Sequence, residues 1–365
     1  MDEKKLKALE RVREEIAKID AKKNKVFFFT LDTKGVASGS LEYIYKLAKI
    51  AKDDGYDVSI LYQVEKGDEF VGVKEWLGEE YASLPHYNVA GDEVDVTPSD
   101  IVFIPEIFSN VMNQTKKLPC KRVAILQNFN YMLEQMPFAA QWGDFGILEC
   151  ITNTQYNKEL LTDVFPYVKT TVVTPYIDKV FGNTIEPKKM IVNVVAKDQS
   201  DINKIIKPFY WKYNTFKWVS FRDLRGFSKE GFANALREAA ITIWVDTDTS
   251  FGYSAIEAMK SGSIVIAKIP DTPLEWLDSD DKDAVTLRNC CVWFDDFNTV
   301  QKHIATVVRA WITDKVPAEI ETEAKKVTEL YSEEKTKTEF LTYLSNTIEG
   351  RKLELQNILK DNGDN

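Results

Sequence analysis

The sequence predicts an α/β protein with two doubly wound domains, and three observations carry this prediction. Apolar runs of strand length alternate with segments of helical periodicity along most of the chain, as in parallel sheets covered by helices. The alternation restarts after a proline-containing segment at residues 175–187. The chain has 365 residues, 44% of them hydrophobic, which is enough for two such domains.

The first half opens with a charged segment, residues 3–24, whose apolar side chains follow one helical stripe; we expect a helix packed on the first domain. Val26–Thr30 is a continuous apolar run, typical of a parallel strand buried on both faces. A loop, a helix from about Leu41 to Gly55 and a strand at Val58–Tyr62 follow. The remaining predicted elements of this half are strands at 100–105, 122–127, 146–153 and 170–178 and a helix at 155–164.

The loop after the first strand, Leu31–Ser40, contains the small residues Gly35, Ser38 and Gly39. A strand, a small-residue loop, a helix and a second strand form the opening of many nucleotide-binding domains. The loop has neither a Gly-x-Gly-x-x-Gly pattern nor a Walker lysine, which disfavours a dinucleotide cofactor or a P-loop.

The second half repeats the same alternation. Its predicted strands lie at 190–195, 215–221, 241–245, 263–267 and 292–294, and its helices at 202–213, 231–240, 298–312 and 318–360. We therefore divide the chain into an N-terminal helix (1–24), a first Rossmann-like domain (25–180), a second Rossmann-like domain (186–325) and C-terminal helices (326–365), which we expect to cross back to the first domain.

The composition excludes several classes of protein. A net charge of −10 disfavours tight, sequence-independent binding to nucleic acid, although it leaves room for a local basic groove. No apolar run approaches the roughly 20 residues that span a bilayer, and the N-terminus lacks an apolar signal region, so we expect a soluble, cytoplasmic protein. Four cysteines without a Cys-x-x-Cys pair, together with two histidines, argue against a zinc site. We expect the adjacent Cys290 and Cys291, which precede a strand-like run, to be buried and reduced.

The most informative stretch is Thr249–Gly262, a turn and a helix between two predicted strands. Gly252 allows a ligand to approach the backbone, and a helix that begins near Tyr253 or Ser254 directs free N–H groups and a positive dipole end toward it. Glu257 lies one turn into this helix, where its carboxylate could accept two hydrogen bonds from a diol. The alternative is structural: Ser254 and Glu257 have the spacing of a capping box.

This stretch resembles the donor-sugar segment of GT-B glycosyltransferases, in particular the retaining, nucleotide-sugar-dependent family 4 (group 1) enzymes. That segment reads Glu-Gly-Phe-Gly, four residues, Glu-Ala-Met, a small residue and Gly. The residues that match it are Phe251, Gly252, Glu257, Ala258, Met259 and Gly262. The resemblance implies two Rossmann-like domains that face a cleft, with the acceptor on the first and the nucleotide-sugar donor on the second. It implies neither a permanently bound cofactor nor a metal ion.

The resemblance also implies roles for individual residues. Glu257 would hold the ribose of the donor, the turn formed by Ser250, Phe251, Gly252, Tyr253 and Ser254 would hold the diphosphate, and Thr249 would face the sugar. A basic residue after the first strand of the second domain usually contacts the diphosphate. Lys197 has this place, with Lys204, Arg222 and Arg225 as rivals. In the first domain, the loop with Gly35, Ser38 and Gly39 would face the cleft.

Thr249 and Ser250 replace the first Glu and Gly of the family pattern. Thr249 has a hydroxyl but no charge, so either the donor sugar is unusual, a pentose or a differently oriented hexose, or the site has lost activity. Asp246 and Asp248 lie beside it and could supply a carboxylate, or could simply cap the loop.

The catalytic candidates are Asp32 and Glu106, two carboxylates at predicted strand ends of the first domain. Many relatives place a histidine after a strand of this domain, but neither His86 nor His303 has that position; Asn128 and Asn130 stand there instead. An inverting enzyme needs a carboxylate to deprotonate the acceptor, whereas in a retaining enzyme the leaving phosphate can take the proton.

The sequence therefore predicts a glycosyltransferase, a hexosyl- or pentosyltransferase, that moves a sugar from a nucleotide-diphosphate sugar to an unidentified acceptor, with retention. The acceptor could be a glycan, a protein or a modified nucleic-acid base. Residues 207–218 interleave lysines and aromatic residues as single-strand nucleic-acid platforms do, but their periodicity predicts that most of the rings lie in the core. The alternatives are a non-catalytic nucleotide-sugar- or glycan-binding protein, a sugar-phosphate epimerase or phosphorylase of the same architecture, or a structural protein on the same scaffold. The oligomeric state is open.

Overall fold

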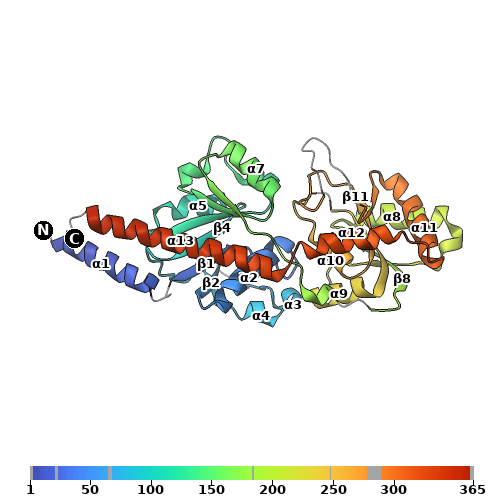
Figure 1. Cartoon of the computed structure of the whole chain (residues 1–365), viewed down its shortest axis with the longest axis horizontal. Coiled ribbons are helices and arrows are strands. Elements are labelled where there is room, and N and C mark those ends of the chain that lie inside the picture. Colours follow the sequence, from blue (N-terminus) through green and yellow to red (C-terminus); the bar gives the residue numbers. More distant parts are fainter. Residues whose placement is uncertain are drawn as a thin grey trace. The chain divides into compact units, whose positions relative to one another are not determined.

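The computed structural model describes residues 3–20, 24–64, 68–182, 185–246, 248–277 and 289–361. The chain divides into two compact units, each with its own sheet (Figure 1). Unit 1 comprises Met1–Thr174 and Thr336–Asn365, and unit 2 comprises Pro175–Lys335. The first division thus falls a few residues before the 180–186 boundary placed from the sequence, and the return to unit 1 falls after residue 335 rather than at 326.

Unit 1 is built on a seven-stranded parallel sheet with the order β3-β2-β1-β4-β5-β6-β7. The order reverses direction between β1 and β4, and the carboxyl ends of strands at such a switch point leave a crevice where ligands commonly bind. The strands are β1 Lys25–Thr30, β2 Asp57–Tyr62, β3 His86–Asn88, β4 Ile101–Pro105, β5 Lys121–Leu126, β6 Glu149–Thr152 and β7 Lys169–Val172.

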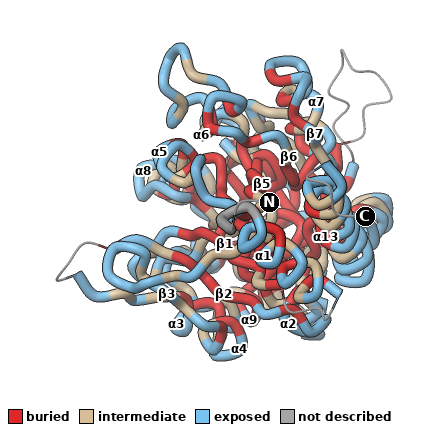
Figure 2. The backbone as a smooth tube through the Cα atoms, turned by 90° about the vertical axis from the view of Figure 1, so that its left-hand side faces the viewer, coloured by how far each residue is buried: buried red, intermediate tan, exposed pale blue. Residues whose placement is uncertain are grey.

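Helices cover both faces of this sheet, and Figure 2 shows its strands buried at the centre with exposed helix surfaces outside. On one face the rings of Phe28 and Phe103 stack with their centroids 4.9 Å apart, and Phe340 packs against both. On the other face Phe27, Phe29 and their neighbours form a separate buried cluster. The helices are α1 Glu3–Asp20, α2 Gly39–Asp53, α3 Lys74–Leu77, α4 Glu79–Ala82, α5 Ser109–Gln114, α6 Phe129–Gln135, α7 Gln155–Val164 and α13 Glu333–Asp361.

The first and last helices of the chain lie side by side in unit 1 (Figure 1), where Lys352 of α13 pairs with Asp20 of α1. The Glu15 carboxylate of α1 is buried and accepts hydrogen bonds from the N–H and hydroxyl of Ser99. Arg351 of α13 donates to the carbonyls of Pro98 and Pro119 at 2.8 and 2.7 Å. Both helices are therefore tied to the loops that precede β4 and β5.

Unit 2 contains a five-stranded parallel sheet with the order β12-β11-β10-β8-β9, which reverses between β8 and β10. Its strands are β8 Lys189–Val195, β9 Ser220–Asp223, β10 Ala239–Trp244, β11 Ile264–Lys268 and β12 Val292–Phe294. Its helices are α8 Gln199–Lys212, α9 Lys229–Glu238, α10 Tyr253–Lys260, α11 Phe297–Ile312 and α12 Ala318–Glu329. Helices again pack on both faces, in two separate buried clusters.

The elements differ from the predictions in three places. Residues 318–360 are helical, as predicted, but they form two helices, because the chain breaks at 330–332, where Tyr331 is buried and its carbonyl accepts the N–H of Ile177. The expected strand at 215–221 begins only at Ser220, after a 3-10 turn at Asn214–Phe216. β3, α3 and α4 were not predicted, since each spans only three or four residues.

The aromatic stretch at 207–218 divides between core and surface. Phe209 and Phe216 are buried, as predicted, but Trp211 is 74% exposed and Trp218 is 52% exposed. Two residues along a helix turn the side chain by about 200°, so Trp211 points away from the core that Phe209 fills. Cys290 and Cys291 are buried and form no disulfide, as predicted, and the same holds for Cys120 and Cys150. Within the described residues, no helix combines the length and the apolar character needed to cross a bilayer.

Candidate functional site

The turn before α10 adopts a conformation that only glycine takes easily. Gly252 has φ of 74°, in the left-handed region, and stands immediately before the first residue of the helix, Tyr253. The Thr249 hydroxyl accepts the Gly252 N–H at 3.1 Å. A Cβ at Gly252 would lie 3.4 Å from Trp244 and 3.5 Å from Leu274, which are ordinary contacts, so the backbone conformation rather than lack of space favours glycine. The helix begins where the sequence predicted.

The capping-box alternative for Ser254 and Glu257 is wrong. Gly252 occupies the N-cap position without a side-chain cap, and Ser254 is already the second residue of the helix. A capping box needs its serine outside the first helical turn, so the left-handed glycine moves Ser254 past the capping position. Glu257 is only 6% exposed, one turn into α10.

Neighbouring side chains hold this turn rigidly. The Phe251 carbonyl accepts the Trp276 indole N–H at 2.8 Å, and the Thr249 carbonyl accepts the Thr272 hydroxyl at 2.9 Å. The ring of Phe251 is buried and contacts Tyr253 and Tyr331, with centroid distances of 4.5 and 4.8 Å. The backbone N–H groups at the start of α10 are therefore fixed before any ligand binds.

Lys197 and Asp246 follow β8 and β10, the two strands at the switch point of unit 2. The Lys197 ammonium lies 2.9 Å from the Asp246 carboxylate. Burial raises the pKa of Asp246, and the neighbouring Lys197 opposes that shift. The three rival cations pair with other carboxylates, Lys204 with Asp201, Arg222 with Glu238 and Arg225 with Asp223.

In unit 1 the two catalytic candidates have different surroundings. Asp32, whose side chain is 4% exposed, accepts the N–H groups of Lys34, Val71 and Gly72 at 3.0, 3.0 and 3.3 Å. Its carboxylate therefore ties the loop after β1 to residues 71–72, as a structural anchor would. The loop glycine Gly35 has φ of 81° and packs beside Val71.

Glu106 follows β4 and is 2% exposed. Its Oε1 accepts the N–H groups of Gln127 and Asn128 at 3.2 and 2.9 Å, whereas its Oε2 has no hydrogen-bond partner among the described residues. Burial raises the pKa of this carboxyl to about 7, although the three backbone N–H groups around it oppose the shift.

Glu106 lines a pocket of about 140 Å³ at the switch point between β1 and β4. Ser38, which caps α2 by accepting the Leu41 N–H at 3.4 Å, also lines it. Sequence reasoning identified Glu106 and Ser38 but missed Ser40, Gln127 and Tyr131, which also line the pocket. Gln127 directly follows β5, which was the available signal; Ser40 and Tyr131 lie in the first turns of α2 and α6, where no such signal exists. The full lining is Thr30, Leu31, Ser38, Ser40, Leu41, Ile44, Pro105, Glu106, Ile107, Phe108, Gln127 and Tyr131.

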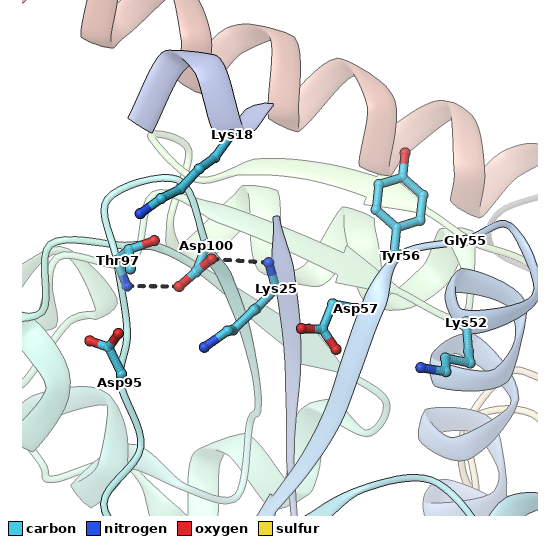
Figure 3. A pocket seen from close by; sticks show the side chains of 9 residues that line it. All are labelled: Lys18, Lys25, Lys52, Gly55, Tyr56, Asp57, Asp95, Thr97 and Asp100. Atoms are coloured by element: carbon cyan, nitrogen blue, oxygen red, sulfur yellow. Dashed lines mark hydrogen bonds between the residues drawn. The ribbon is translucent and has the colours of Figure 1, made fainter. Parts of the chain in front are cut away.

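A larger pocket, of about 540 Å³, lies at the amino ends of the strands of the same sheet (Figure 3). Lysine and aspartate side chains of α1, β1, β2 and the loop before β4 surround it. Asp100 there uses both carboxylate oxygens, accepting the N–H groups of Lys25 and Thr97 at 3.0 and 2.7 Å (Figure 3). None of the residues selected from the sequence lines this pocket. Across the described ranges, no three His, Cys, Asp or Glu side chains gather closely enough to hold a metal ion.

Comparison with known proteins shows which fold these elements form. The chain is similar over most of its length to sucrose-phosphate synthase from Thermosynechococcus elongatus, with a TM-score of 0.56, 12% identity and coverage of 93% of this chain and 99% of that one. It is also similar to HepE from Anabaena, solved with UDP-glucose, with a TM-score of 0.60, 11% identity and coverage of 88% and 99%. The chain has the GT-B fold. The predicted fold class is therefore confirmed.

Other GT-B proteins with a similar structure include an α-glucosyltransferase solved with UDP and a DNA that contains an HMU base, with a TM-score of 0.56, 12% identity and coverage of 89% and 99%. Among curated sequences, an alpha-1,6-glucosyltransferase from Actinobacillus pleuropneumoniae serotype 7 (strain AP76) is 24% identical over 231 residues. That match covers 62% of this chain and 66% of the relative. No family model matches the sequence.

Proposed function

We propose that this GT-B protein transfers a sugar from a nucleoside-diphosphate sugar to a hydroxyl-bearing acceptor. The observation that carries the proposal is the rigid turn at Gly252, which places the start of α10 one helical turn before the buried carboxylate of Glu257. Backbone N–H groups and the positive end of a helix dipole suit a diphosphate. A buried carboxylate at this distance suits the two hydroxyls of a ribose.

Further residues complete the proposed donor site. Lys197 neutralises part of the diphosphate charge, since it stands at the switch point of unit 2 beside Asp246. Ser250 and Tyr253 belong to the turn around the left-handed Gly252, so their backbones border the diphosphate. The Thr249 hydroxyl is engaged by the Gly252 N–H, so we assign Thr249 to shaping the turn. The contacts to the sugar hydroxyls then fall to Asp246 and Asp248.

The donor sugar we propose is a hexose, glucose carried by UDP. The support comes from the similar proteins, one named an alpha-1,6-glucosyltransferase and another solved with UDP-glucose. We also propose that transfer retains the anomeric configuration, with the leaving diphosphate taking the acceptor proton. Of the two carboxylates of unit 1, we place Glu106 beside the acceptor, because one of its oxygens is unpaired among the described residues while Asp32 anchors loops.

Thermal unfolding with UDP-, GDP-, ADP- and CMP-sugars tests the donor site. A ligand at 100 times its dissociation constant stabilises a fold by about 2.7 kcal/mol, so UDP-glucose should raise the melting temperature measurably. Glu257→Ala should weaken this binding by about 2 kcal/mol, roughly thirtyfold, because it removes hydrogen bonds to a buried charged group.

Glu230→Ala is the matched control, since Glu230 is an exposed carboxylate in the first turn of α9, in the same unit. It should leave the shift unchanged. Equal donor affinity in the wild type and in Glu257→Ala would refute the assignment of Glu257.

A second candidate function is nucleotide-sugar binding without transfer. Thr249 favours it, because a neutral hydroxyl that already serves the turn replaces the acidic residue of the family pattern. Release of UDP from UDP-glucose in the presence of a saccharide acceptor separates the two functions: turnover supports the transferase, and binding without turnover supports this alternative.

A further inference from the structure

Helix α8 and the turn that follows it have a charge opposite to that of the protein as a whole. Residues 202–222 contain five lysine or arginine residues and no aspartate or glutamate, in a chain whose net charge is −10. Helix α11, which packs beside α8 (Figure 1), also contains no acidic residue. A local surplus of positive charge on an acidic protein indicates a surface that meets an anionic partner.

Most of these cations have no carboxylate partner. Three of the five are exposed and form no ion pair with a described residue: Lys207, Lys212 and Lys217. The other two, Lys204 and Arg222, pair with carboxylates. Arg309 of α11 adds an exposed cation to the same surface, since its guanidinium lies 5.1 Å from the centre of the Phe216 ring and 5.8 Å from that of Tyr213. Four cations are therefore available to an external anion.

Two exposed tryptophans stand among these cations. Trp211 is 74% exposed and Trp218 is 52% exposed, and they lie on either side of the 3-10 turn Asn214–Phe216 that follows α8. The ring of Trp218 packs edge-on against Phe216, with the centroids 6.2 Å apart. Phe216 thus holds Trp218 and Arg309 at one place on the surface. Large apolar side chains that a charged surface leaves exposed mark an interaction site.

We propose that this surface docks on a membrane that contains anionic lipids. We call it the α8 patch, and its residues are Lys207, Trp211, Lys212, Lys217, Trp218 and Arg309. Tryptophan prefers the boundary between water and hydrocarbon, because its ring is apolar while its N–H needs a hydrogen-bond acceptor. The cations around the two rings meet the lipid phosphates, and each one strengthens binding to an anionic surface. This docking goes beyond the proposed sugar transfer and does not depend on it.

A single-stranded nucleic acid, the other polyanion that aromatic and basic side chains bind, fits the patch less well. Proteins that bind single strands stack successive bases on aromatic rings along a positively charged groove. Trp211 points away from the core that Phe209 fills, whereas Trp218 contacts Phe216, which itself stacks on Phe209. The two rings therefore form no continuous platform, and neither pocket described above includes a patch residue. A lipid interface imposes no such spacing on the groups that enter it.

The acidic remainder of the protein makes the docking specific to this face. Exposed charges interact over about 8 Å at physiological salt, so the patch cations attract an anionic surface locally while acidic faces are repelled. High salt shortens this range to about 3 Å. We therefore expect binding to anionic vesicles that high salt weakens.

Co-sedimentation of the full chain with vesicles tests the docking. Vesicles of phosphatidylcholine alone are compared with vesicles of equal parts phosphatidylcholine and phosphatidylglycerol, and only the mixed vesicles should bind. Combining Lys207→Gln, Lys212→Gln and Lys217→Gln should weaken this binding roughly a hundredfold, because each lysine contributes separately near an anionic surface. Combining Trp211→Ser and Trp218→Ser should weaken it about tenfold, because the apolar rings no longer enter the interface.

A matched control makes the same change in net charge elsewhere. Lys116→Gln, Lys117→Gln and Lys169→Gln together alter three exposed lysines of unit 1, and this variant should bind the mixed vesicles as the wild type does. Every substituted residue is exposed, so all variants should melt at the same temperature by circular dichroism. Quenching of tryptophan fluorescence by brominated lipid gives a second measurement, and it should be lost in the double tryptophan variant.

Each remaining outcome would overturn the docking. No binding to the mixed vesicles would do so, and so would equal weakening in the two triple lysine variants, since net charge rather than the α8 patch would then decide. Binding of an oligothymidylate that only the patch variants lose, without vesicle binding, would make the patch a nucleic-acid surface instead. The UDP-glucose shift is measured on the same samples, and since no patch residue belongs to the proposed donor site, either proposal can fail while the other stands.

Discussion

Glu106 and Asp100 show at the level of single residues how backbone donors determine what a buried carboxyl can do. Both flank β4 and both have pKa values that burial raises. Asp100 has an N–H on each oxygen, whereas Glu106 has two on one oxygen and no described partner for the other. The first is fully hydrogen-bonded, whereas the second keeps one buried oxygen without a described partner.

The raised pKa of Glu106 predicts a pH-dependent stability. The folded protein holds this proton more tightly than the unfolded chain, so the stabilisation is fully present below about pH 4.5 and is lost as the pH rises through about 7. Relative to the wild type, Glu106→Gln should therefore gain about 3 kcal/mol of unfolding free energy over this range, as a shift from 4.5 to about 7 requires. Urea unfolding at pH 5 and pH 8 measures it; parallel pH profiles for the two proteins would contradict the prediction.

The left-handed conformation of Gly252 predicts that its substitution lowers both the stability of unit 2 and the affinity for the donor. Gly252→Ala forces a side chain into the left-handed region and should destabilise unit 2 by about 1–2 kcal/mol. Because the substitution favours another backbone conformation in the turn, it should also weaken UDP-glucose binding. Gly55→Ala, with φ of 95° and open space around its Cβ, should show a similar strain with donor affinity unchanged. Isothermal titration of both variants provides the comparison, and equal donor affinities would count against the turn as the diphosphate site.

The sequence was sufficient to predict some site residues but not to distinguish the roles of others. Gly252 and Glu257 could be selected because their spacing in a contiguous motif fixes their relation to one helix. The difference between Asp32 and Glu106 could not be predicted, because it depends on N–H groups of Val71, Gly72, Gln127 and Asn128, which are far away in sequence.

At the level of elements, periodicity predicted the long strands and helices with small errors at their ends. It predicted the 155–164 helix with the bounds that the structure shows, because Thr154 caps it and an apolar face repeats along it. It failed where tertiary contacts override local preference, as at 330–332, where Tyr331 packs against Phe251. It also failed at Trp211 and Trp218, since composition alone does not show which rings face solvent.

The contacts of α13 predict that Arg351 stabilises unit 1 more than its neighbour Lys352 does. Arg351→Met removes hydrogen bonds to the carbonyls of Pro98 and Pro119 and should lower the unfolding free energy of unit 1 by about 1–3 kcal/mol. Lys352→Met removes only a surface ion pair with Asp20 and should change little. Urea titrations of the two variants decide this; equal losses would mean that the Arg351 contacts carry no particular weight.

At the level of the whole molecule, the structure assigns the last helix to the core of unit 1. Phe340 and Tyr343 of α13 contact Phe103 of β4, while unit 2 is formed by one continuous segment. The sequence predicted two α/β domains and a terminal helical region, because each domain shows its own alternation. It could not locate the return at 335–336, since this point lies within the first turn of α13, in a charged helical stretch whose composition does not change there.

This organisation predicts which fragments fold. Residues 1–174 alone should not fold cooperatively, because they lack the helix that covers Phe28 and Phe103. The same residues joined to 336–365 by a short Gly/Ser linker should fold, since the Thr336 hydroxyl donates to the Thr174 carbonyl at 2.6 Å and the two ends are adjacent. Residues 175–335 should fold alone. Circular dichroism during heating tests all three, and cooperative melting of 1–174 would contradict the assignment.

Because Thr174 and Thr336 lie next to each other, unit 2 could be exchanged as a whole during evolution. The outgoing and returning segments leave unit 1 at neighbouring residues and remain hydrogen-bonded beyond it, from the Ile177 N–H to the Tyr331 carbonyl. Unit 2 is therefore inserted into the chain of unit 1 between two residues that lie next to each other. A different module whose ends lie equally close could replace it in one recombination event, while every internal contact of unit 1 is preserved.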